Sequence, residues 1–125
     1  MAIVFDTYAW IEFFEGSKKG ETVKNYLDND EVITPAIVLL ELSYKSNKEG
    51  WSFNKFFSFI KMKSKIVGVN DEFILSFGGF YNKMKKKEKK IGITDVIIMH
   101  TARVNNAKVL TGDPHFNNFK DSVML

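Results

Sequence analysis

Hydrophobic positions along the chain fall into two patterns, short continuous apolar runs and longer stretches with helical spacing. The apolar runs predict buried strands at residues 2–5, 31–34, 65–69, 108–111 and 122–125. Apolar residues three and four apart predict helices at residues 8–14, 17–30, 35–47, 51–63 and 94–105, and a long helix after the cap Asn70. Because strands and helices alternate, we predict one α/β domain over residues 1–125, a three-layer α/β/α sandwich with a mostly parallel central sheet.

Local signals also predict where individual helices begin and break. Thr7, Thr34 and Thr94 each stand at the start of a helical stretch and are predicted to cap it. Pro35 would then occupy the first helical position, where its missing N–H costs nothing. Gly78–Gly79 lies inside the long helix, where each glycine costs roughly 1 kcal/mol relative to alanine. We therefore expect a kink or a break in that helix.

Four acidic residues interrupt or end apolar runs. Each lies at the junction between a predicted strand and a predicted helix, or on the helix next to such a junction. They are Asp6, Glu41, Asp95 and Asp113. Such an acid costs free energy unless something pairs with it, and four together would repel until at least one held its proton. A hard divalent cation removes this conflict, because Mg²⁺ and Mn²⁺ take oxygen ligands. The pattern therefore predicts a metal site suited to phosphate chemistry.

Each acid also has a purely structural interpretation when it is taken alone. Asp6 could cap the helix that follows it, and Asp95 could be a favourable acid in a first helical turn. Asp113 precedes Pro114, which is a common turn pattern. Glu41 is harder to explain in this way, because it follows a mostly apolar helical segment. Taken together, the four favour a site over four separate structural roles.

The composition narrows the class of protein. Of 125 residues, 45% are hydrophobic, and twelve are phenylalanine, so the chain can bury a core of its own. The absence of cysteine excludes a disulfide framework and a thiolate metal site. The first strand begins at Ala2 without a basic flank, and no apolar run approaches the roughly 18 residues of a membrane helix. We therefore expect a cytoplasmic protein without a signal peptide or membrane contact.

The positive charge is concentrated in one segment. The net charge is +3, and residues 83–90 contain six lysines. Such a run attracts polyanions, but the favoured interpretation is a solvated helix end that is stabilised by the helix dipole. Arg103 is the only arginine, so bidentate readout of bases or phosphates can contribute little.

The histidines and aromatic residues are assigned mainly to packing. His100 lies on a largely apolar helix and is predicted to be a hydrogen-bonded core residue, whereas His115 lies in a turn, with a lesser option as a metal or phosphate contact. A set of aromatic side chains could stack on bases, although their helical spacing favours the core and a protein interface. These are Trp10, Phe13, Phe14, Phe53, Phe56, Phe57 and Phe59.

Four segments in order carry a resemblance that covers essentially the whole chain. They are Val4–Thr7, Thr34–Leu42, Ile93–Ala102 and Val109–Phe116. In order, spacing and total length the chain resembles PIN-domain ribonucleases of the small VapC toxin type. The resemblance implies a metal-dependent endonuclease site built from the four acids above, with a hydroxyl residue at Thr111 and a less certain second one at Thr7. His115 departs from the pattern, because many relatives have an acid there.

The resemblance implies a Mg²⁺- or Mn²⁺-dependent endoribonuclease, the toxin of a type II toxin–antitoxin pair. It further implies an RNA substrate, a homodimer and an antitoxin partner. An alternative is a PIN-like RNA-binding or scaffold subunit with little catalysis. Two other classes fit poorly: a receiver domain needs paired acids after its first strand, and a haloacid-dehalogenase-type phosphatase needs Asp-x-Asp there. Here Asp6 is followed by Thr7 and Tyr8.

Overall fold

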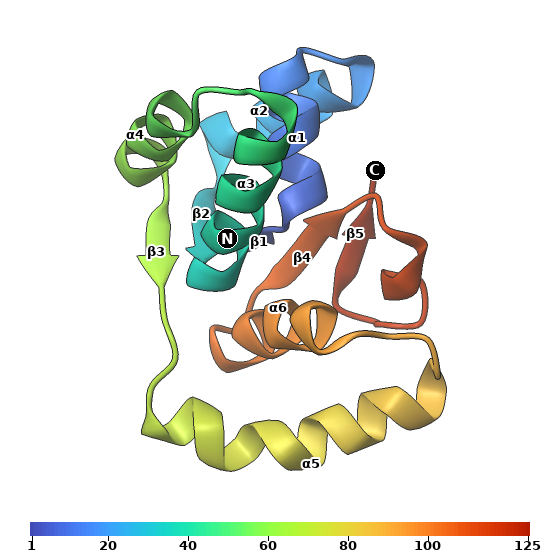
Figure 1. Ribbon diagram of the computed structural model, residues 1–125. Coiled ribbons are helices and arrows are strands. Elements are labelled where there is room, and N and C mark those ends of the chain that lie inside the picture. Colours follow the sequence, from blue (N-terminus) through green and yellow to red (C-terminus); the bar gives the residue numbers. More distant parts are fainter.

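The computed structural model describes all residues, 1–125, and contains a five-stranded sheet (Figure 1). The strands are β1 (Ala2–Phe5), β2 (Glu31–Pro35), β3 (Lys65–Val67), β4 (Lys108–Thr111) and β5 (Ser122–Met124). Their order across the sheet is β3-β2-β1-β4-β5, and every neighbouring pair is parallel. The predicted α/β architecture is confirmed, although β3 ends two residues earlier than the sequence suggested.

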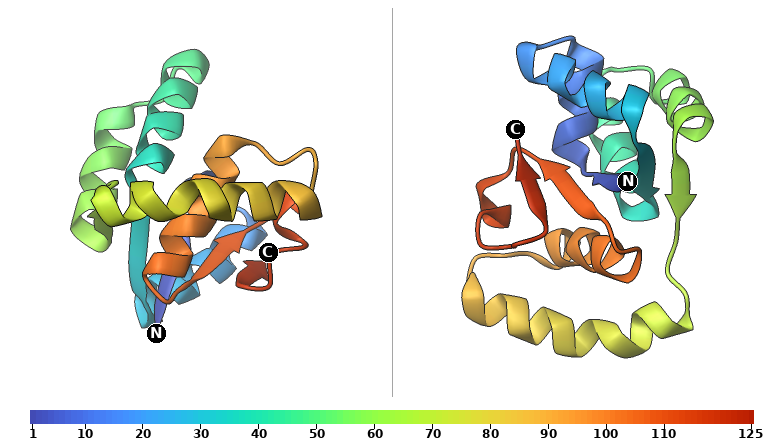
Figure 2. Two further views of the ribbon diagram at one scale, coloured as in Figure 1. Left: turned by 90° about the horizontal axis from the view of Figure 1, so that it is seen from below. Right: turned by 180° about the vertical axis from the view of Figure 1, so that it is seen from behind.

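Six α-helices and a short 3₁₀ helix connect the strands. They are α1 (Thr7–Glu15), α2 (Lys18–Asn29), α3 (Ala36–Glu49), α4 (Phe53–Lys63), α5 (Asp71–Lys87), α6 (Ile93–Val104) and η1 (Pro114–Phe116). Helices α1 and α2 pack together on one side of the sheet, and α6 packs on the other, where it separates α5 from the strands (Figures 1 and 2). No helix is both long enough and apolar enough to cross a bilayer.

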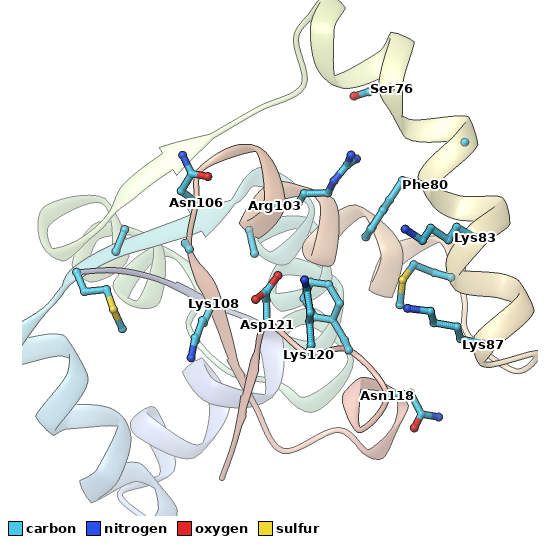
Figure 3. A pocket seen from close by; sticks show the side chains of 17 residues that line it. Ser76, Phe80, Lys83, Lys87, Arg103, Asn106, Lys108, Asn118, Lys120 and Asp121 are labelled. Atoms are coloured by element: carbon cyan, nitrogen blue, oxygen red, sulfur yellow. The ribbon is translucent and has the colours of Figure 1, made fainter.

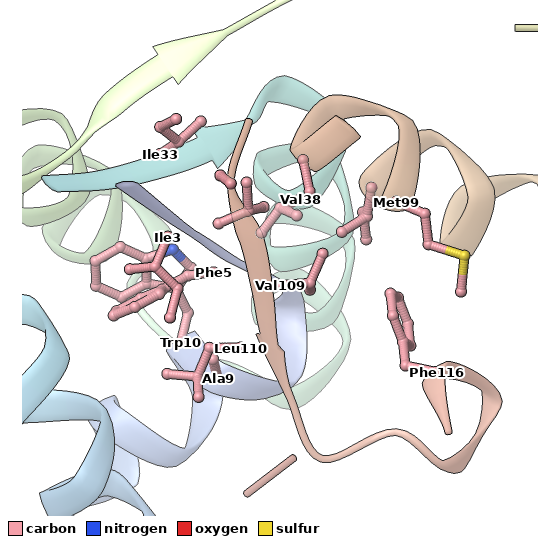
Figure 4. Packing of buried hydrophobic residues seen from close by; sticks show 14 of the residues in the cluster. Ile3, Phe5, Ala9, Trp10, Ile33, Val38, Met99, Val109, Leu110 and Phe116 are labelled. Carbon is pink, nitrogen blue, oxygen red and sulfur yellow. The ribbon is translucent and has the colours of Figure 1, made fainter. Parts of the chain in front are cut away.

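The core fills the space between these layers with side chains from the central strands and the helices over them (Figure 4). Trp10 is fully buried and forms the centre of an aromatic cluster with Phe5, Phe13, Phe14 and Phe59. Ring-edge and stacked contacts of this kind add to the burial of apolar area. The aromatic residues of α1 and α4 therefore pack against one another, as their spacing predicted.

Three predicted helix caps are wrong, each because another residue takes the position. Asp6 rather than Thr7 caps α1, since its carboxylate accepts a hydrogen bond from the backbone N–H of Ala9. The Thr34 hydroxyl instead accepts the indole N–H of Trp10 at 3.2 Å.

Helices α3 and α6 also begin at other positions than the predicted caps Thr34 and Thr94 imply. Pro35 pairs within the sheet as the last residue of β2, so α3 starts one residue later than predicted. Gly92, not Thr94, precedes the first turn of α6.

Helix α5 runs without interruption through Gly78–Gly79, so the predicted kink or break is wrong. Phe73, Phe80 and Met84 are buried on one face of this helix, on both sides of the glycines. Burying such a side chain contributes roughly 1.5–3 kcal/mol, which outweighs the cost of about 1 kcal/mol at each glycine. The dipole is also matched, by acids in the first turn and lysines in the last.

His100 is a core residue, as predicted. Its side chain is fully buried on α6, and its Nε2 lies 2.9 Å from the hydroxyl of Ser76 on α5. Burial and the positive charge of Arg103 lower the pKa of His100, which therefore stays neutral. The histidine thus links the two helices that form the outer layer on this side of the sheet.

Candidate active site

All four predicted acids line one pocket, which lies at the carboxyl ends of the central strands. Its volume is about 310 Å³, and its lining residues are Asp6, Thr7, Tyr8, Glu41, Asp95, Ile98, Asp113 and Pro114. Asp6 directly follows β1, and Asp113 follows β4 by one residue, Gly112. Because parallel strands end at the same edge of a sheet, neighbours β1 and β4 bring these two acids together. Helices α3 and α6 supply Glu41 and Asp95.

Asp6 is the most buried of the four acids, with 3% of its surface exposed. Its Oδ1 accepts the N–H of Ala9 at 2.8 Å, so the same carboxylate caps α1 and faces the pocket. Burial raises its pKa to about 7, against hydrogen bonds from Thr111 and Ala9 that favour the charged form. Repulsion from Asp113 and Glu41 is a smaller cause of the same rise in pKa. Asp6 therefore needs a positive partner to be fully ionised at neutral pH.

Glu41 projects from α3 and is held by α1. The Thr7 hydroxyl donates a hydrogen bond of 2.6 Å to its Oε1. Burial is the main cause that raises the pKa of Glu41, and repulsion from Asp95 and Asp113 adds to it. The hydrogen bond from Thr7 and the charge of Lys45 act in the opposite direction. One oxygen of Glu41 is thus fixed, and its proton affinity is raised.

Asp95 and Asp113 lie beside His115, whose role the sequence left open. His115 Nδ1 lies 3.1 Å from Asp95 Oδ2 and 3.7 Å from Asp113 Oδ1. One ligating atom from each of the three lies within 4.8 Å of the others, a spacing that could hold a metal ion. Asp6 and Glu41 are outside this group but line the same pocket. His115 stands two residues after Asp113, and this position had already suggested a metal contact as a lesser option.

Hydrogen bonds of the loop after β4 place Asp113 and His115. The backbone N–H of Asp113 donates to Thr111 Oγ1 at 3.0 Å, and the backbone N–H of His115 donates to Asp113 Oδ1 at 2.9 Å. The Thr111 side chain also lies near the Asp6 carboxylate and favours its charged form, which lowers the pKa of Asp6. Thr111 thereby connects two of the acids, although it is itself fully buried.

Tyr8 is a pocket residue that the sequence reasoning missed. A β-carbon at Gly112 would overlap the Tyr8 ring, so only glycine fits at this approach of the loop to α1. The Tyr8 hydroxyl accepts a hydrogen bond of 3.0 Å from Lys19. No sequence pattern marks this contact, since it depends on how α1 meets the loop after β4.

The donor atoms in the pocket fit a divalent cation. They are the carboxylate oxygens of the four acids, which suit Mg²⁺ or Mn²⁺, and the imidazole of His115 lies beside two of these acids, Asp95 and Asp113. Asp6 is buried and forms no salt bridge, so its charge has no cationic partner among the protein groups around it. A cation would supply that partner for Asp6 and would relieve the repulsion among the four acids.

A family model and several solved structures match this chain. The model of the PIN domain matches residues 3–121. VapBC2 from Rickettsia felis, bound to a DNA fragment from its promoter, has 18% identity and a TM-score of 0.78, over 100% of this chain and 98% of that one. VapBC-1 from nontypeable Haemophilus influenzae has 24% identity and a TM-score of 0.72, over 100% of this chain and 97% of that one.

A further match is VapC20 of Mycobacterium tuberculosis, a toxin that cleaves the sarcin–ricin loop. It has 15% identity and a TM-score of 0.71, over 98% of each chain. At these identities the likeness to solved structures concerns the fold. No curated protein sequence matches this one.

Proposed function

Because this chain belongs to the PIN domain family, we propose that it is a Mg²⁺- or Mn²⁺-dependent endoribonuclease. The observation that carries the proposal is the gathering of Asp6, Glu41, Asp95 and Asp113 around one pocket at the carboxyl edge of the sheet. VapC20, which shares the fold, is a toxin that cleaves the sarcin–ricin loop. A PIN-like RNA-binding subunit with little catalysis is the alternative, and it would not need four acids in one pocket.

The acids would hold the cation directly or through water. When bound, a divalent cation lowers the pKa of an attacking water and offsets negative charge on the phosphate oxygens. Asp6, Asp95 and Asp113 contribute the charge that retains it. Thr111 lies next to two of the acids, because its Oγ1 accepts the backbone N–H of Asp113 and its side chain favours the charged form of Asp6 by lowering the pKa.

Glu41 is the residue that we assign to proton transfer. Its Oε1 accepts the Thr7 hydroxyl, which leaves Oε2 to orient the attacking water and accept its proton. The raised pKa of Glu41 makes it a stronger base than an ordinary glutamate. The water oxygen then forms a bond to phosphorus, and the bond from phosphorus to the leaving ribose oxygen breaks. The leaving oxygen takes up a proton from solvent or from the protonated Glu41.

The nuclease proposal is tested by cleavage of RNA with added Mg²⁺ or Mn²⁺, with EDTA, and with an Asp6→Asn variant. We expect cleavage with either metal and none with EDTA or the variant. Asp71→Asn is the matched control, because Asp71 is an exposed acid in the first turn of α5, outside the pocket. Full activity in EDTA would overturn the metal-dependent mechanism. RNA binding without cleavage under every metal condition would favour the alternative.

We further propose that the chain is the toxin of a toxin–antitoxin pair. Four of the solved structures with this fold are toxin–antitoxin complexes by name. A mainly apolar pocket of about 280 Å³ is lined by Ile11, Phe14, Glu15, Leu42, Trp51 and Phe56. Ile11 is one helical turn from Thr7, and Leu42 follows Glu41, so one bound segment could cover both pockets.

Growth of a host that expresses the chain tests the toxin proposal. Expression should arrest growth, and the Asp6→Asn variant should not. Coexpression of a protein encoded beside its gene should restore growth if that protein is the antitoxin. Unimpaired growth with well-expressed, RNA-cleaving protein would contradict the toxin role.

A homodimer is the remaining proposal on partners. Leu40 and Tyr44, four residues apart on α3, are 65% and 69% exposed on either side of Glu41. Apolar side chains so exposed on one helix face mark a contact surface. Light scattering should give twice the mass of the chain, and Leu40→Asp should return it to the monomer mass. An unchanged dimer in that variant would place the interface elsewhere.

A further inference from the structure

A second pocket, lined by cations, lies at the opposite end of the sheet from the four acids. Its volume is about 750 Å³, and it lies among α5, α6, the start of β4 and the segment before β5 (Figure 3). Five of its lining residues are basic: Lys83, Lys87, Arg103, Lys108 and Lys120. Asp121 is the single acid among the residues that line it. We call this pocket the basic groove.

The cations of the groove have no anionic partner in the protein. None of the five forms a salt bridge, and neither does Asp121. Arg103 lies over the ring of Phe80, with 5.1 Å from the guanidinium carbon to the ring centroid. Lys83 and Lys87 reach from α5 toward Lys120 on the facing segment (Figure 3). Like charges that converge on a concave surface concentrate the positive potential there, which attracts an anion.

The structure divides the lysine run of residues 83–90 into two parts. Lys83 and Lys87, one helical turn apart, line the groove, and Met84 between them is buried. Lys85 is turned toward the end of the helix, because its amine donates a hydrogen bond of 2.8 Å to the backbone carbonyl of Ile91. The run is therefore not one uniform patch, and only part of it can serve a ligand in the groove.

We propose that the basic groove binds the phosphate backbone of the RNA substrate, away from the bond that is cleaved. The choice of RNA rests on the proposed nuclease function. The cations are spread over four segments of the chain, which suits an extended polyanion better than a single phosphate. Phe80 and Phe119 are buried in the wall of the groove, so they offer no free ring face on which a base could stack. The groove therefore contacts RNA without reading its sequence.

The separation of the two pockets sets a minimum length for RNA that reaches both. On α6, Asp95 lines the acidic pocket and Arg103 the groove, which places them about 12 Å apart along the helix axis. Lys108 and Thr111, at opposite ends of β4, are about 10 Å apart along the strand. A stacked strand with a rise of about 3.4 Å per nucleotide needs about four steps, or roughly five nucleotides, to span about 12 Å. Longer RNA reaches the groove as well.

A triple variant, Lys83→Gln/Lys87→Gln/Lys120→Gln, tests the proposal against a charge-matched control. The control is Lys18→Gln/Lys48→Gln/Lys63→Gln, which changes three exposed lysines outside both pockets. Binding of a fluorescent RNA of about 20 nucleotides, ample to reach both pockets, is measured by anisotropy in EDTA at several salt concentrations. Without metal no cleavage is needed, so the result does not depend on whether the chain is a nuclease. Circular dichroism checks that all variants are folded.

The groove variant should bind the long RNA more weakly, with a salt slope reduced by about 0.7 for each phosphate that the protein no longer neutralises. The control should keep a slope near that of the wild type. Equal slopes for the two variants would overturn the proposal. The proposal would also be overturned if the groove variant lost binding to polyglutamate but bound RNA like the wild type. That result would favour an acidic protein partner for the groove. If the groove variant binds RNA more weakly but the wild type does not cleave RNA with any metal, the nuclease function is refuted and the groove proposal stands.

Discussion

Replacement of Asp6 by asparagine should make the metal-free protein more stable at neutral and alkaline pH. Burial raises the pKa of Asp6 from 3.8 to about 7. Each unit of difference between the folded and unfolded pKa corresponds to about 1.4 kcal/mol, so ionised Asp6 costs the folded state about 4 kcal/mol. Asparagine carries no charge and caps a helix about as well as aspartate. The variant should therefore avoid this cost and keep the cap of α1.

The effect has a defined pH window. Because the folded pKa of Asp6 is the higher one, the folded state binds more protons than the unfolded state between about pH 4 and pH 7. Stability of the wild type should fall with rising pH over this window and level off above pH 7. Below pH 4 the carboxyl is protonated in both states, and the two proteins should have similar stability.

Thermal denaturation in EDTA at pH 4.5 and pH 8 measures this difference. For a domain of this size, about 4 kcal/mol corresponds to a melting temperature higher by roughly 10–15 °C at pH 8. Saturating Mg²⁺ should stabilise the wild type by about 2.7 kcal/mol at a concentration one hundred times its dissociation constant, and the variant by less. Asp71→Asn should show no such pH-dependent gain. A variant that melts at or below the wild-type temperature at pH 8 would show that Asp6 serves the fold.

Three further changes test other contacts of the acidic pocket. His115→Asp replaces an imidazole by a carboxylate, so titration calorimetry should show a preference shifted from Mn²⁺ toward Mg²⁺; an unchanged ratio would place His115 outside the metal site. Gly112→Ala should cost about 1–3 kcal/mol in denaturant unfolding, because its β-carbon would overlap the ring of Tyr8. Adding Tyr8→Ala to Gly112→Ala should recover most of the lost stability. If Gly112→Ala alone costs no stability, the close approach of Gly112 to the Tyr8 ring is contradicted. Thr7→Val removes the hydrogen-bond donor to Glu41, so single-turnover cleavage should slow about tenfold with RNA affinity unchanged. Equal cleavage rates would show that Glu41 does not need this hydrogen bond for catalysis.

The amino-acid sequence alone was sufficient to predict the elements and the four acids of the candidate site. Strand and helix patterns depend on side-chain periodicity within a few residues, so they could be read before any contact was known. Asp6, Glu41, Asp95 and Asp113 were identified in the same way, because each places a charge in an apolar segment. Their order relative to strands and helices then sufficed to predict one site, and all four line one pocket.

The partner that each polar side chain takes depends instead on the tertiary fold. Thr34 could cap a helix by local rules, but the indole of Trp10, 24 residues away in sequence, occupies its hydroxyl. His115 faces Asp95 because of how the loop after β4 meets α6. The sequence showed the lysine run as a concentration of positive charge. Its division between the basic groove and the helix end depends on the packing of α5 against α6. Periodicity fixes which residues share a face of one element, but the layers of the fold decide what that face meets.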